Sequence, residues 1–102
     1  MIIMNNVIYT TEQIKEILYP VFQTHHVRKA LLFGSYVHGT AKEYSDVDIV
    51  VDSGLRGLAF YGLLEDVVNS LNKNVDLLDI TQIVPESEVD KQIRSTGVVI
   101  YE

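Results

Sequence analysis

Hydrophobic residues recur along the chain at two spacings, one typical of amphipathic helices and one typical of strands. The helical spacing predicts three helices, over residues 10–23, 58–72 and 87–96. Short apolar runs predict three strands, over residues 27–33, 47–51 and 75–80. Residues 98–101 either add a fourth strand or lie along the core. The predicted order is helix, strand, strand, helix, strand, helix, in one domain of residues 1–102.

The boundaries of these elements have recognisable signals. Thr10 and Gln13 have the spacing of a capping box, and Pro20 predicts a kink or an early end to the first helix. The run that closes on Phe33 is continuously apolar, which suits a central strand covered on both faces. In the second long helix the predicted inner stripe consists of Leu64, Val67, Val68 and Leu71.

Two acids interrupt the strand at residues 47–51, where stability alone favours apolar side chains. Strand alternation places Asp46 and Asp48 on the same face, about 6.6 Å apart at roughly 3.3 Å per residue. Such carboxylates can hold Mg²⁺, and two-metal phosphoryl sites use ions about 3.5–4 Å apart. Asp76 supplies a third carboxylate if its strand lies beside theirs. Gly34 lets a backbone approach phosphate closely, and Ser35 offers a hydroxyl and an N–H.

Each of these features also has an ordinary structural interpretation. Asp-x-Asp is commonly a turn or a solvated strand end, and Gly-Ser after a strand is commonly a turn. Asp76 alone could cap a strand or pair with Lys73. Only the combination of the three features indicates chemistry.

Composition limits the classes of function. Fourteen acids against eight bases give a formal charge of −6, which disfavours direct binding to nucleic acid. A phosphate substrate would therefore need divalent cations. The chain has no cysteine, no apolar run that could span a membrane and no signal-peptide pattern, so we expect a cytoplasmic protein.

The run Gly34-Ser35, ten residues, Asp46-Val47-Asp48 resembles the signature of the minimal nucleotidyltransferases of the polymerase-beta-like superfamily. Leu32-Phe33, Ser45 and the segment 74–78 extend the resemblance over nearly the whole chain. It implies an α/β fold of the α+β type, with a short mixed sheet flanked by helices.

The resemblance also implies roles for individual residues. Gly34 and Ser35 would hold the triphosphate of ATP, and Asp46 and Asp48 would bind two Mg²⁺ ions. Asp76 would be the third carboxylate at the metal site and would draw the proton from the attacking hydroxyl. Relatives often carry an arginine after Gly-Ser; this chain has none there, so His38 or Lys42 would contact phosphate instead, unless His38 merely ends a helix.

We expect no room in these 102 residues for the acceptor-binding domain of larger relatives, so the acceptor would either be small and bound in an open cleft or be delivered by another protein. The resemblance to minimal nucleotidyltransferases implies the second of these cases. It implies that the chain is an antitoxin, which transfers AMP to a tyrosine of a helical HEPN RNase toxin. Leu55, Leu58, Phe60 and Tyr61 are candidates for the partner surface. Two alternatives stay open: a module that neutralises its partner by contact alone, and a transferase acting on a small molecule such as an aminoglycoside.

Overall fold

The computed structural model describes residues 5–102, and the expectations for residues 1–4 lie outside that range. Its helices and strands, in chain order, are α1 (Thr11–Thr24), β1 (Lys29–Phe33), α2 (Ser35–His38), β2 (Val47–Asp52), α3 (Leu58–Leu71), β3 (Val75–Asp79), the 3₁₀ helix η1 (Ile80–Gln82), α4 (Glu88–Thr96) and β4 (Val98–Tyr101). In this part of the chain no helix has the length and apolar character needed to cross a bilayer.

The four strands form one mixed sheet in the order β3-β2-β1-β4. β1 pairs antiparallel with both β2 and β4, whereas β2 and β3 run parallel. The parallel pair arises because α3 carries the chain back across the sheet between β2 and β3. The mixed sheet and the central position of β1 are both as predicted, and residues 98–101 form a fourth strand.

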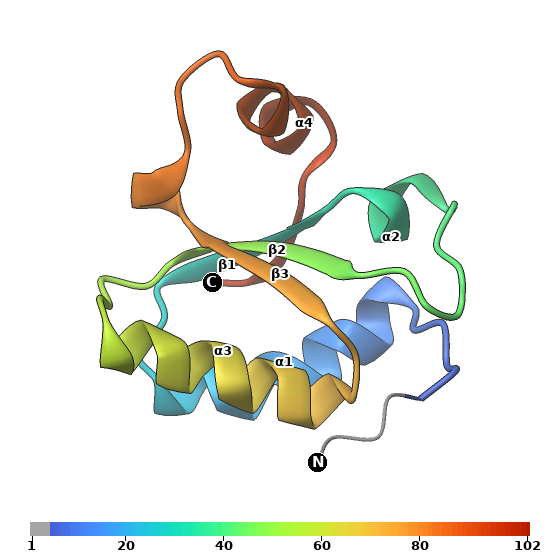
Figure 1. Ribbon diagram of the computed structural model, residues 1–102, viewed down its shortest axis with the longest axis horizontal. Helices are drawn as coiled ribbons and strands as arrows, with labels where there is room; N and C mark the ends of the chain where they lie inside the picture. The colour runs from blue at the N-terminus through green and yellow to red at the C-terminus, as the bar shows by residue number, and fades with distance from the viewer. Residues whose placement is uncertain (1–4) are drawn as a thin grey trace.

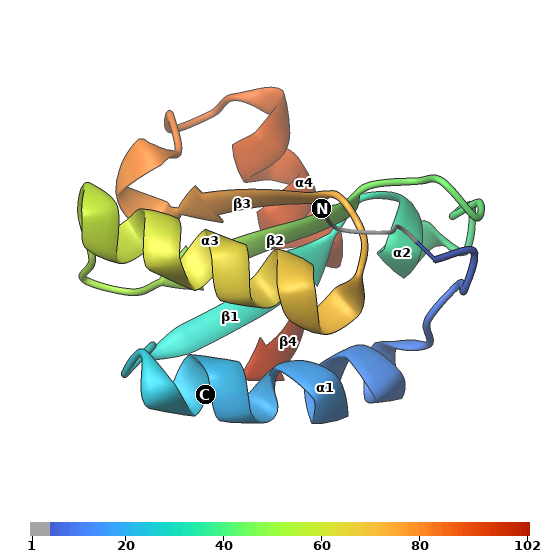
Figure 2. The ribbon, with the colours of Figure 1, turned by 60° about the horizontal axis from the view of Figure 1, so that its bottom comes forward.

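α1 and α3 lie side by side on one face of the sheet, as Figures 1 and 2 show from two directions. The core lies between these helices and the sheet, and it includes the fully buried side chains of Ile14, Phe22, Ile49 and Val67. α4 lies on the opposite side, and the short α2 lies at the end of β1 (Figure 1). This second face is covered only in part, which leaves room for a site.

α4 and the segment before it arch over the second face. Between this arch and the sheet is an apolar hollow of about 260 Å³ whose floor is formed by Leu31 and Val50. These two residues are direct partners in the β1–β2 register. The hollow therefore lies on the face of β2 that also carries Asp48.

Two details of the helices differ from expectation. Pro20 lies inside α1, which continues to Thr24, so it does not end the helix early. Pro20 and Glu16, the residue whose carbonyl loses its helical donor at a proline, are both exposed. In α3 the buried stripe is Leu63, Val67 and Leu71, while the predicted Leu64 and Val68 are only partly buried.

Candidate active site

Asp48 and Asp76 lie directly opposite each other on the parallel strands β2 and β3. Paired residues on neighbouring strands point to the same face of a sheet, so the two carboxylates share the open face. Val47 and Ile49, which flank Asp48 in β2, are fully buried on the other face. The alternation predicted along β2 is therefore correct for Asp48, whereas Asp46 precedes the strand and its shared face with Asp48 stays a prediction.

Gly34 brings the loop after β1 against Asp48. Phe33, the last residue of β1, pairs with Asp48, and Gly34 follows with φ +76°. A Cβ atom at Gly34 would collide with Asp48 Oδ2 and lie 3.1 Å from its Cγ. Only glycine combines this backbone conformation with this close approach.

Gly34 also begins α2, where Ser35 is the first helical residue. The Gly34 carbonyl accepts hydrogen bonds from the backbone N–H groups of Val37 (3.0 Å) and His38 (3.2 Å). Tyr36 is buried in the core and so attaches this short helix to the body of the protein. Ser35 is thereby held one residue from the glycine that touches Asp48.

The electrostatic environment of Asp48 matches a cluster of acids. Burial and, after it, the negative charges of Asp76 and Asp46 together raise the pKa of Asp48 from its ordinary value of 3.8 to about 6. Partial burial and like charges both penalise the ionised carboxylate. A cation placed among these groups would relieve both effects.

Asp46 precedes β2 and is exposed. Its position depends on the preceding turn, in which Lys42 N–H donates to Ser45 Oγ (2.8 Å) and Ser45 N–H donates to the Lys42 carbonyl (3.1 Å). His38 and Lys42 are both exposed, with His38 at the end of α2. Their proposed phosphate contacts remain predictions.

The carboxylates of Asp46, Asp48 and Asp76 are ligands that suit Mg²⁺. This ion prefers carboxylate oxygens and fills its other coordination positions with water and substrate phosphate. Within residues 5–102, no three His, Cys, Asp or Glu side chains converge into a ready-made metal site. The raised pKa of Asp48, caused in part by Asp46 and Asp76, is the feature of this structure that fits a cation. When bound, Mg²⁺ would neutralise the carboxylates and polarise the phosphates of a nucleotide.

Two buried polar groups were missed by sequence reasoning. Lys73 is 2% exposed, and it donates to main-chain carbonyls rather than pairing with Asp76. Asp79 is 5% exposed and accepts hydrogen bonds from Ser53 and Thr81. Asp79-x-x-Gln82 is a capping-box pattern that could have revealed the second group, whereas nothing near Lys73 in sequence signals its burial.

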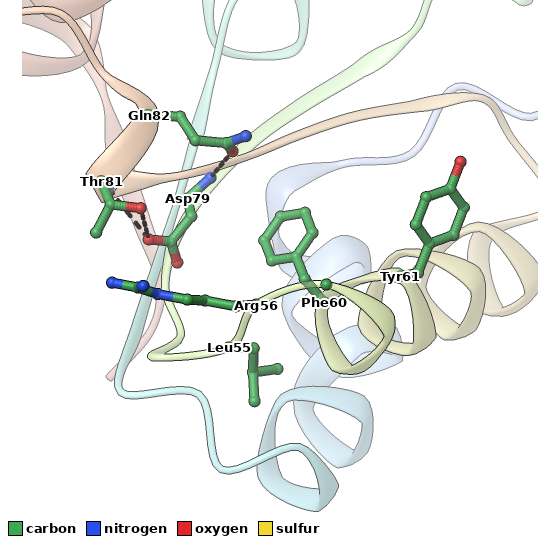
Figure 3. A pocket seen from close by; sticks show the side chains of 8 residues that line it. Leu55, Arg56, Phe60, Tyr61, Asp79, Thr81 and Gln82 are labelled. Atoms are coloured by element: carbon green, nitrogen blue, oxygen red, sulfur yellow. Dashed lines mark hydrogen bonds between the residues drawn. The ribbon is translucent and has the colours of Figure 1, made fainter.

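Figure 3 shows a separate hollow of about 420 Å³ near the far ends of β2 and β3, where Asp79 bonds to Thr81 and Gln82. Leu55, Phe60 and Tyr61 also line it, but none of the three clustered acids does. Of the candidate partner residues, Leu58 and Tyr61 are exposed, whereas Leu55 and Phe60 are partly buried against the core. Their role in binding a partner stays a prediction.

A family model described as "Polymerase beta, Nucleotidyltransferase" matches residues 12–102. The chain belongs to this nucleotidyltransferase family. The matched region of this nucleotidyltransferase includes the Gly34-Ser35 pair and all three acids.

Two relatives come from Methanocaldococcus jannaschii, and both are named putative protein adenylyltransferase. One is 36% identical over 72% of this chain and 81% of its own length, and the other is 37% identical over 68% and 87%. Both relatives agree with the assignment of the chain to the nucleotidyltransferase family.

Solved structures have the same fold. A toxin-antitoxin complex with AMP-PNP matches with a TM-score of 0.72 at 24% identity, over 85% of this chain and 72% of that one. A complex of a tri-AMPylated HEPN toxin with an MNT antitoxin, from Shewanella oneidensis, matches with a TM-score of 0.67 at 20% identity, over 90% and 72%. The predicted polymerase-beta-like fold is confirmed.

Proposed function

We propose that this nucleotidyltransferase transfers AMP from ATP to a tyrosine hydroxyl of a HEPN RNase toxin and so acts as its antitoxin in the cytoplasm. The observation that carries the proposal is the close approach of Gly34 to Asp48, which lies opposite Asp76. The names of the M. jannaschii relatives and the HEPN complexes among its structural neighbours support the acceptor class. The domain of residues 1–102 would act as a single unit.

In the proposed reaction the acceptor oxygen forms a bond to the α-phosphorus of ATP, and the bond to the pyrophosphate leaving group breaks. Gly34 and Ser35 would hold the triphosphate, with His38 or Lys42 contacting its oxygens. Asp76 would accept the proton from the acceptor hydroxyl. Asp46 and Asp48, with Asp76 as the third carboxylate, would hold two Mg²⁺ ions, which supply the positive charge that stabilises the developing negative charge.

Incubation of the chain with its HEPN partner, ATP and Mg²⁺, followed by intact-mass measurement of the partner, tests this function. We expect wild type to add AMP and the Asp46→Ala/Asp48→Ala variant to add none. Asp52→Asn is the matched control, because Asp52 is also an acid of β2 but bonds to Arg28 at the strand end. It should transfer AMP as wild type does.

Two outcomes would point elsewhere. If the partner gains no mass and the double variant still neutralises it, contact alone accounts for the antitoxin effect. If an aminoglycoside is modified while the partner is not, the acceptor is a small molecule.

A further inference from the structure

Lys73 is buried although lysine side chains seldom are. It is 2% exposed and lies in the turn between α3 and β3. The other buried polar residues within 5–102 are Ser53 and Asp79, so Lys73 is the buried basic side chain of the described region. A buried ammonium costs stability unless polar groups surround it.

The ammonium is held by main-chain oxygens and an aromatic ring. It donates hydrogen bonds to the carbonyls of Glu43 (2.7 Å) and Asn5 (3.1 Å) and lies 6.0 Å from the ring centroid of Tyr9. No ion pair between Lys73 and an acid is present among the described residues. Charge-assisted hydrogen bonds of this kind are stronger than neutral ones.

These contacts connect the two segments that carry the outer acids. Glu43 lies in the turn before Asp46, an acid outside the ladder of β2 whose place depends on that turn. Lys73 itself lies three residues before Asp76, and the carbonyl of the intervening Asn74 accepts from Val47 N–H (3.0 Å). The side chain of Lys73 thus holds the turn before Asp46 in place relative to β3, the strand that carries Asp76.

We propose that Lys73 is a positioning residue for the carboxylate cluster, setting Asp46 against Asp48 and Asp76 through the Glu43 carbonyl. This inference rests on the proposed metal-dependent function of those acids. Residues that orient metal ligands typically change metal affinity by about 10–100-fold when they are removed. An apolar residue of similar length would leave the Glu43 carbonyl without its donor and the turn without its anchor.

The test is Mn²⁺ binding in the presence of a non-hydrolysable ATP analogue, measured by calorimetry well below the melting temperature of every variant. Lys73→Met should weaken Mn²⁺ binding about tenfold or more. Lys73→Arg should recover part of the loss, because arginine keeps N–H donors and a hollow of about 120 Å³ beside Lys73 can take the larger group. Metal binding is read without any transfer reaction, so a failure of the proposed acceptor chemistry would leave this result intact.

Two controls separate positioning from stability. Lys91→Met removes an exposed lysine on α4 and should leave Mn²⁺ binding unchanged. Asp79→Asn weakens the hydrogen bonds from Ser53 Oγ (2.6 Å) and Thr81 Oγ1 (2.7 Å) at the far end of β3, away from the contacts of Lys73. It should lower the melting temperature without changing Mn²⁺ affinity.

Folded Lys73→Met that binds Mn²⁺ as tightly as wild type would overturn the proposal. If that variant does not fold, Ser45→Ala is the deciding variant. It removes the hydroxyl that accepts from Lys42 N–H and so loosens the turn before Asp46 without changing a residue of the core. Weakened Mn²⁺ binding in Ser45→Ala supports the proposed chain of contacts, and unchanged binding refutes it.

Discussion

Asp48 is destabilising in the absence of a cation, because its charge is partly buried and faces two other acids. Its folded-state pKa of about 6 lies above the ordinary 3.8, so the native state binds a proton more readily than the unfolded chain. Stability therefore falls as the pH rises through the interval between these values. This direction is opposite to that of an acid held in an ion pair.

Asp48→Asn should raise the melting temperature of metal-free protein at pH 8, because asparagine removes the penalised charge. The gain should shrink as the pH falls from about 6 toward 3.8, where wild-type Asp48 is protonated as well. Thermal unfolding in EDTA across this range measures the effect. A lower melting temperature for Asp48→Asn at pH 8 would assign Asp48 a structural role.

Gly34→Ala should reduce AMP transfer by roughly 100-fold, because its new Cβ displaces the Asp48 carboxylate and small misplacements at a reacting centre are that costly. The positive φ should also cost about 1–2 kcal/mol of stability. Gly57→Ala is the matched control, since Gly57 has φ +56° but nothing within 4 Å of its built Cβ. It should lose comparable stability and keep its transfer rate, and equal rates for the two variants would contradict the role of Gly34.

The clustered acids could be predicted from sequence, whereas the buried lysine could not. Alternation along β2 and the Gly-Ser spacing are local patterns that pointed to Asp46 and Asp48, and Asp76 joins them because β3 lies beside β2, which was the condition set for it. The burial of Lys73 depends on carbonyls 68 and 30 residues away in the chain. No local pattern contains that information.

At the scale of elements, the sequence predicted the long helices because their hydrophobic residues recur at helical spacing, and it predicted three of the strands because each is a short apolar run. The stripe of α3 was displaced by one position, to Leu63 in place of Leu64, because the helix packs against both the sheet and α1 rather than against the sheet alone. No local pattern predicted that β4 pairs with β1, because the position of an edge strand depends on a strand that is distant in sequence.

Asp79 joins three elements, and its chemistry is opposite to that of Asp48. Burial tends to raise its pKa, but hydrogen bonds from Ser53 and Thr81 outweigh burial and hold the pKa below the ordinary value. Its carboxylate links the end of β2 to η1 through bonds of 2.6 Å to Ser53 Oγ and 2.7 Å to Thr81 Oγ1. Its contribution to stability is thus present above the unfolded-state pKa and lost as the pH falls through the lower folded value.

Asp79→Asn should lower stability at pH 7 by about 1–3 kcal/mol, because an amide cannot accept all of these hydrogen bonds. The loss should diminish in acid, where the wild-type carboxylate is protonated. Thermal unfolding at both pH values measures it. Asp52→Asn breaks an exposed pair with Arg28 and should cost about 1 kcal/mol or less; an equal loss in the two variants would contradict the special role of Asp79.

At the scale of the whole molecule, an acidic chain must bind a substrate that is itself strongly negative. The formal charge is −6, and three of its acids lie where the triphosphate is proposed to lie. Repulsion between these charges opposes binding of free ATP. The nucleotide and the metal should therefore bind together or not at all.

Thermal unfolding with a non-hydrolysable ATP analogue tests this coupling. With Mg²⁺ and the analogue at about 100 times its dissociation constant, wild type should gain about 2.7 kcal/mol of stability. In EDTA the analogue should give almost no gain, and Asp46→Ala/Asp48→Ala should gain nothing from either condition. Asp52→Asn should respond as wild type does, because its acid bonds to Arg28 outside the cluster. Equal stabilisation of wild type in Mg²⁺ and in EDTA would mean that the loop at Gly34 and Ser35 binds the triphosphate without metal.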